Sequence, residues 1–91
     1  MDWDEVGGTE TLLLTADRHL LRRDIAELQP GDVILFRMRS DAVAKHLGIC
    51  SGLAPFPTFI HAYANHGVVE SALSEPWQRR IAAVFAFPGT H

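Results

Sequence analysis

The stretch Q-P-G-D-V-I-L-F-R-M occupies Gln29–Met38, and A-K-H-L-G-I-C and F-I-H-A-Y follow at Ala44–Cys50 and Phe59–Tyr63. Pro30 and Gly31 favour a turn, because proline fixes φ and glycine tolerates positive φ. The run V-I-L-F that follows has four apolar residues without alternation. That pattern is typical of a strand buried on both faces.

The second stretch predicts a strand over Ala44–Ser51 and the third predicts one over Phe59–Tyr63. Period-two geometry puts one set of residues on a single face of the earlier strand, namely Ala44, His46, Gly48 and Cys50. Glycine inside a strand commonly marks close approach by another group. We therefore expect tight packing over Gly48, beside the ring of His46, and we expect a helix to supply it.

The remaining elements follow from their own patterns. Leucine and alanine at helical spacing predict an amphipathic helix over Thr9–Arg23. Ser-Glu-Pro predicts a short helix from Ser74 to about Arg80. Two further apolar segments predict strands at Val68–Ser71 and Ala82–Phe87.

These elements predict an α+β fold, with one N-terminal helix, then about five antiparallel strands, and one short helix before the last. Tight turns between short strands imply a strongly curved sheet, most of a half-barrel. The 91 residues are expected to form a single domain, with a lead-in at 1–8, helix and connector at 9–27, and sheet at 28–88. A free-standing SH3-like barrel acting as a binding module is the alternative architecture.

Composition excludes several classes of function. The net charge of −3 and the absence of a basic stripe argue against nucleic acid as a partner. No apolar run approaches the ~20 residues that span a bilayer, so we expect no membrane partner. The acidic N-terminus has neither the basic nor the apolar region of a signal peptide, so we expect synthesis in the cytoplasm without one.

His46 and His61 are the candidate catalytic residues. Antiparallel neighbouring strands can bring such a pair into contact. One imidazole then takes a proton from a nucleophile, and the second holds the first in its tautomer and orientation. Two unrelated, half-buried histidines are the open alternative, as is a metal site made by this pair with Cys50 or His66. No CxxC or HExxH spacing supports a metal, so we expect neither metal nor other cofactor.

Cys50 is the single cysteine, which excludes a disulfide within the chain. Four residues along an extended strand place its Cα about 13 Å from that of His46, beyond hydrogen-bonding distance. No helix N-terminus is predicted there to lower its pKa. We expect Cys50 to be a small buried residue, so the sequence predicts no nucleophile in this chain. It does not indicate which residues bind the substrate.

Four motifs in order resemble NlpC-type (NlpC/p-sixty) cell-wall peptidases over about residues 28–88. The run Leu28–Phe36 looks like the entry to a strand in these peptidases. H-L-G-I at His46–Ile49 looks like their H-x-G-I strand, which carries the catalytic base. F-I-H-A at Phe59–Ala62 looks like the strand that carries the third polar residue of their catalytic triad. Gly67–Ser71 matches the strand that follows.

The resemblance implies a papain-like fold and metal-free cleavage of the γ-D-glutamyl–diaminopimelate bond in peptidoglycan stem peptides. It also implies that His46 is the general base and His61 its orienting partner. The family's nucleophile is a Cys in a D-C-x-G/S-like motif that opens a helix well upstream of the P-G-D turn. No Cys precedes Pro30 here.

The ending, Pro76–Ile81 and then Phe85–Pro88, is similar to the phage-type and gene-transfer-agent members. This implies action in the tail of a phage-like particle, with peptidoglycan stem peptides and tail-hub or tail-tip proteins as partners. Either the chain begins inside a longer gene, or it is a short, catalytically inactive structural or wall-binding tail-tip protein. In both cases we expect these 91 residues alone to be inactive and to need a partner for stability.

Overall fold

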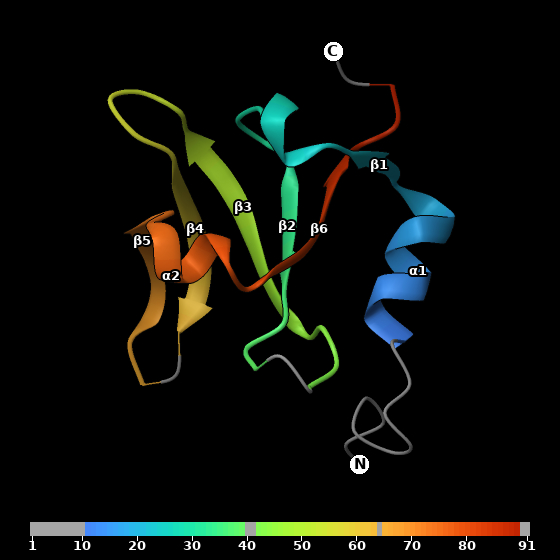
Figure 1. Cartoon of the computed structure of the whole chain (residues 1–91), viewed down its shortest axis with the longest axis horizontal. Coiled ribbons are helices and arrows are strands. Elements are labelled where there is room, and N and C mark those ends of the chain that lie inside the picture. Colours follow the sequence, from blue (N-terminus) through green and yellow to red (C-terminus); the bar gives the residue numbers. More distant parts are fainter. Residues whose placement is uncertain (1–10, 40–41, 64, 90–91) are drawn as a thin grey trace.

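The computed structural model describes residues 11–39, 42–63 and 65–89 as a twisted antiparallel sheet with helical segments against it (Figure 1). The predicted lead-in at 1–8 and the predicted helix start at Thr9 lie outside the described residues. The elements, in chain order, are α1 (Thr11–His19), β1 (Leu21–Arg23), the 3-10 helix η2 (Ile25–Glu27), β2 (Val33–Phe36), β3 (His46–Gly52), β4 (Thr58–Tyr63), β5 (Gly67–Ala72), α2 (Glu75–Gln78) and β6 (Ile81–Ala86). The sheet has the strand order β1-β6-β2-β3-β4-β5.

The strand β2 lies in the middle of the sheet, and all four of its residues are buried. It pairs with β3 on one side and with β6 on the other. Gly31, with φ of 93°, makes the turn before it, and Asp32 N–H donates to the Gln29 carbonyl at 3.0 Å. The predicted turn and the strand buried on both faces are therefore confirmed.

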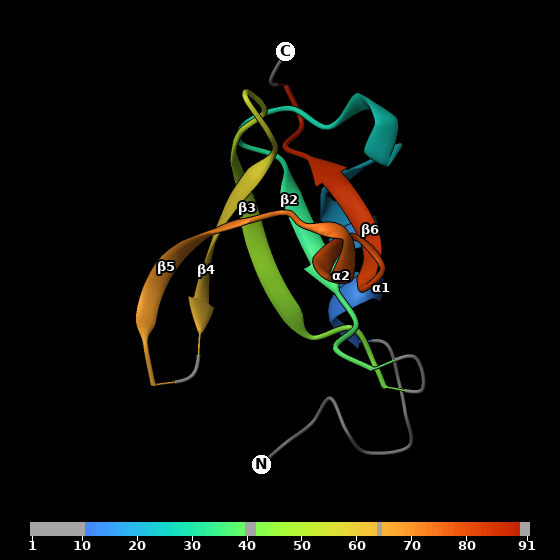
Figure 2. The same ribbon diagram turned by 60° about the vertical axis from the view of Figure 1, so that its left-hand side comes forward.

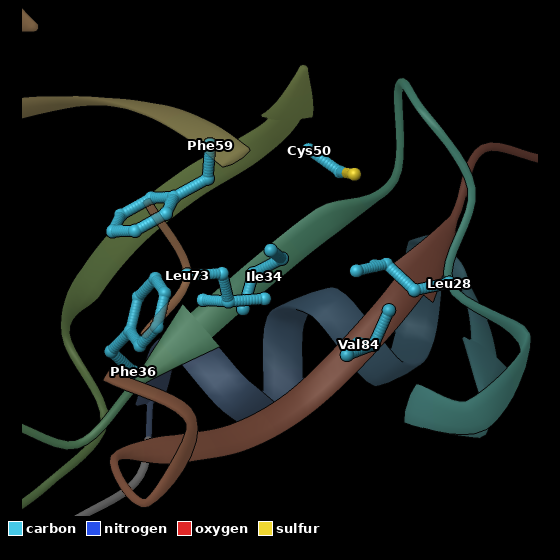
Figure 3. Close-up of a cluster of buried hydrophobic side chains, with 7 residues drawn as sticks. All are labelled: Leu28, Ile34, Phe36, Cys50, Phe59, Leu73 and Val84. Carbon is cyan, nitrogen blue, oxygen red and sulfur yellow. The ribbon is translucent and has the colours of Figure 1, made fainter. Parts of the chain in front are cut away.

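Each face of the sheet has its own apolar core. The first core (Figure 3) includes Phe36, Cys50 and Phe59, and Trp77 of α2 packs against it. The second core, on the other face, includes Val33, Leu35 and Phe85, and the apolar residues of α1 pack against that one, namely Leu12, Leu13 and Ala16. Figure 2 shows the curvature of the sheet, with the connection from β5 running across it to α2. The helices α1 and α2 therefore cover opposite faces.

The predicted helix over Thr9–Arg23 is wrong at its C-terminal end. The helix ends at His19, and Leu21–Arg23 forms the edge strand β1, which pairs with β6. Leu20 still packs on the core beneath α1, so the helical spacing of its apolar residues is real. Sheet pairing along β6 outweighs helix propensity here, because each added residue of β1 gains backbone hydrogen bonds from an existing strand.

The predicted strand over Ala44–Ser51 begins two residues late, at His46. Ala44 lies in the core under α1, rather than on the same face as His46. Backbone alternation predicts a shared face only where the backbone is extended, and residues 44–45 precede the strand. The α+β fold itself, with its short helix before the last strand, is confirmed. Within the described ranges, no helix has both the length and the apolar character needed to cross a bilayer.

Candidate functional site

The rings of His46 and His61 are in direct contact. Nε2 of His46 lies 2.8 Å from Nδ1 of His61, which is hydrogen-bonding distance, and the two ring planes are nearly perpendicular at 83°. Nδ1 of His46 hydrogen-bonds to no group among the described residues. The pair therefore presents one free ring nitrogen, Nδ1 of His46, as its outer end.

Sheet register explains how the two histidines meet. His61 on β4 lies opposite Gly48 on β3, and His46 is two residues before Gly48. The two imidazoles are thus diagonal neighbours on one face, a separation that ring side chains span. The structure therefore contains the contact between the two rings that neighbouring antiparallel strands allow.

Gly48 permits this arrangement because it has no side chain. A Cβ atom at Gly48 would lie 2.8 Å from Cδ2 of Phe59 and 3.3 Å from Cε2 of Phe36. The expected tight packing over Gly48 is confirmed, but the expected helix over it is wrong. Two phenylalanine rings fill the space, since the aromatic residues of β2 and β4 flank the glycine directly.

Aromatic rings surround the histidine pair. The indole of Trp77 on α2 stacks on His46, with centroids 5.7 Å apart and planes at 26°. The Phe59 ring lies 4.3 Å from that of His61. His61 is only 4% exposed. Burial lowers the pKa of both histidines, and the neighbouring His61 lowers the pKa of His46 further. Both rings are therefore held neutral near pH 7, the state in which an imidazole can accept a proton.

Ser71 is a member of the site that the sequence analysis missed. Its Oγ lies 2.9 Å from Nε2 of His61, on the far side of that ring from His46. Ser71 on β5 lies opposite Phe59 on β4, so it is the diagonal neighbour of His61. The sequence did contain a signal for this contact. Val69 and Ser71 share one face of the predicted strand, and a short turn joins that strand to the one that carries His61.

Cys50 lies in the first core, away from the histidine pair. It is 1% exposed, pairs with Phe59 across the sheet, and has its Sγ 3.6 Å from the carbonyl oxygen of Gly52. Burial raises the pKa of its thiol, and a backbone hydrogen bond with Gly52 has a smaller, opposing effect. The expected small buried residue is confirmed, and this thiol is unsuited to form a nucleophilic thiolate.

The alternative metal site gains no support from the geometry. Across 11–39, 42–63 and 65–89, no group of three or more His, Cys, Asp or Glu side chains could hold a metal ion. The ring of His66 packs instead against Tyr63, at 5.4 Å between centroids.

The face under α1 carries exposed apolar surface beyond the reach of that helix. Beside the helix is an apolar cavity of about 560 Å³, and part of its lining comes from β3, β4 and β5. Four large apolar side chains on these strands remain exposed, namely Leu47 (44%), Ile49 (39%), Ile60 (41%) and Val68 (74%). We call these four residues the open apolar face. It is opposite to the Gly48 face, over which the sequence predicts a helix.

Comparison with known proteins gives a fold. No protein-family model matches the chain, and no curated protein sequence matches it either. Among solved structures, an NlpC/P60 family protein from Bacillus cereus superposes with a TM-score of 0.64 at 22% sequence identity. The match covers 77% of this chain but only 23% of that protein. The chain described here therefore has the α+β fold found within an NlpC/P60 family protein.

Proposed function

We propose that this chain supplies the base and its orienting partner for a cysteine peptidase that cleaves peptidoglycan stem peptides. The observation that carries the proposal is the 2.8 Å hydrogen bond between His46 and His61, within a fold shared with an NlpC/P60 protein. The ending of the sequence, P-W-Q-R-R-I and F-A-F-P, supports the tail of a phage-like or gene-transfer-agent particle as the place of action. Tail-hub or tail-tip proteins are then its protein partners.

In the proposed reaction, Nδ1 of His46 takes the proton from a cysteine thiol. The thiolate attacks the scissile carbonyl, and His46 returns the proton to the leaving amine. His61 holds the ring of His46 and stabilises the imidazolium through its Nδ1. The lowered pKa of His46 supports this role, because the ring is neutral and able to accept the proton near pH 7.

The thiol comes from a polypeptide segment other than these 91 residues. Cys50 is buried in the first core and its pKa is raised, so it does not serve. The thiol must reach Nδ1 of His46 on the Gly48 face. We propose that another part of the same polypeptide covers the open apolar face on the other side of the sheet, since burying Leu47, Ile49, Ile60 and Val68 is favourable by about 25 cal/mol per Å² of apolar surface. That contact would also supply the partner that the chain is expected to need for stability.

The test begins with the reading frame upstream of Met1. A D-C-x-G-type motif within about 50–60 codons, the scale of a small domain, identifies the extended protein. The extended protein should release stem-peptide fragments from purified peptidoglycan, detected by mass spectrometry, whereas residues 1–91 should release none. His46→Ala should abolish release, and His61→Ala should lower it by about 10²-fold or more.

Glu27→Ala is the control, since Glu27 is exposed on η2 and does not line the cavity beside His61, and its activity should be unchanged. Release that survives His46→Ala would overturn the proposal. So would release by residues 1–91 that Cys50→Ala abolishes, because Cys50 would then be the nucleophile.

A catalytically inactive structural or wall-binding tail-tip protein is the second candidate. The burial of the single cysteine favours it. A stop codon close upstream of Met1, together with particle function that survives His46→Ala, would select this candidate.

A further inference from the structure

Three side chains form a continuous line of hydrogen bonds across β3, β4 and β5. Nε2 of His46 contacts Nδ1 of His61 at 2.8 Å, and Nε2 of His61 contacts Oγ of Ser71 at 2.9 Å. Because each contact holds one proton, the position of the proton at Ser71 is linked to its position at His46. The line of hydrogen bonds thus has Ser71 at one end and Nδ1 of His46 at the other.

Two arrangements of protons satisfy the line when both rings are neutral. In the first, His46 donates from Nε2 to His61, and His61 donates from its own Nε2 to Ser71, which accepts. In the second, Ser71 donates to His61, and His61 donates from Nδ1 to His46, which then carries its proton on its outer Nδ1. Only the first leaves a lone pair on the outer nitrogen of His46.

The surroundings favour the first arrangement. It puts both protons on Nε2, the nitrogen that a neutral histidine side chain intrinsically prefers. It gives the N–H of the buried His61 an acceptor, and the hydroxyl proton of the half-buried Ser71 can still be donated to water. The second arrangement uses the less favoured nitrogen in both rings.

We propose that Ser71 is a positioning residue that accepts a hydrogen bond from Nε2 of His61 and so keeps Nδ1 of His46 unprotonated. The proposal rests on the proposed function, in which that nitrogen is the base. Ser71 acts through two rings and touches neither substrate nor nucleophile. When His46 takes a proton, the same line spreads the positive charge toward Ser71.

The test is ¹⁵N NMR of the histidine rings, which reports the protonated nitrogen of each neutral imidazole directly. In the wild-type chain, both His46 and His61 should carry their proton on Nε2. Ser71→Thr retains a hydroxyl and should give the same tautomers. Ser71→Ala leaves the Nε2–H of His61 without its acceptor. In this variant a part of the protons of both rings should therefore reside on Nδ1 instead of Nε2.

Ser51→Ala is the matched control. Ser51 is another half-buried strand serine, and its Oγ bonds to Thr58 and Glu70 rather than to a histidine, so its removal should leave the tautomers unchanged. A proton on Nδ1 of His46 in the wild-type chain would overturn the proposal without any variant, even if Ser71→Ala failed to fold. Identical tautomers in the wild type and Ser71→Ala would also overturn it.

The two proposals fail in distinguishable ways. Tautomers as expected, with no release of stem peptides by the extended protein, would reject the peptidase and leave the role of Ser71 in the pair intact. Release of stem peptides with unchanged tautomers in Ser71→Ala would reject the role of Ser71 alone.

Discussion

At the scale of single residues, Gly48 decides the geometry of the candidate site. It lies directly opposite His61, with the rings of Phe59 and Phe36 filling the space that a side chain would take. A larger residue there would push on the same rings that fix the histidines. The glycine that weakens β3 as a strand is thus what lets the aromatic residues pack around the pair.

Gly48→Ala should therefore destabilise the chain by about 1–3 kcal/mol, the usual effect of overpacking a core. The added Cβ would lie 2.8 Å from Phe59, so that ring must move. Chemical denaturation of the two proteins measures the difference. Gly52→Ala is the control on the same strand, because its nearest contact would be Thr58 Oγ1 at 3.4 Å. Equal stability of both variants would contradict the packing described here.

At the scale of elements, β1 is the strand whose place depends most on tertiary contacts. Its Arg23 pairs with Val84 of β6, and its Nε lies 2.9 Å from Oδ2 of the buried Asp32, just before β2. The same carboxylate accepts a hydrogen bond from the backbone N–H of Gln29 at 2.9 Å. Asp32 therefore ties the edge strand to the turn that starts the centre of the sheet.

Asp32→Ala should destabilise the chain by about 1–3 kcal/mol, because it leaves the N–H of Gln29 without its acceptor and the charge of Arg23 without its ion-pair partner. Thermal unfolding followed by circular dichroism gives the comparison. The control is Asp17→Ala, which removes the exposed ion pair between Asp17 and Arg22. Its effect should be clearly the smaller, since exposed ion pairs contribute little. A larger effect for Asp17→Ala would show that β1 is held chiefly through α1.

At the scale of the whole molecule, the two faces of the sheet are covered unequally. The face of the histidine pair is closed by its own aromatic residues and by Trp77 of α2. The other face is covered by α1 only over β2 and β6, and the open apolar face extends beyond it. Exposed apolar surface of this kind marks a site of contact with another segment or protein.

Purified residues 1–91 should therefore bind a hydrophobic dye such as ANS and self-associate as their concentration rises. The double substitution Ile60→Ser, Val68→Ser should reduce both effects, because it removes two exposed members of the apolar face. Phe56→Ser is the control, since Phe56 is 54% exposed but lies in the loop between β3 and β4. A wild-type chain that stays monomeric, binds no dye and unfolds cooperatively would contradict this prediction.

The sequence by itself determined the central strand, the turn at Gly31 and the burial of Cys50, and it offered contact between His46 and His61 as one of several alternatives. These depend on local patterns: an apolar run, a glycine turn and period-two alternation on neighbouring strands. Only the tertiary structure decided that Leu21–Arg23 is a strand, that Phe36 and Phe59 cover Gly48, and that Ser71 completes the line of hydrogen bonds. Each of these depends on partners distant in sequence, and the free energy of pairing with them outweighs local preference.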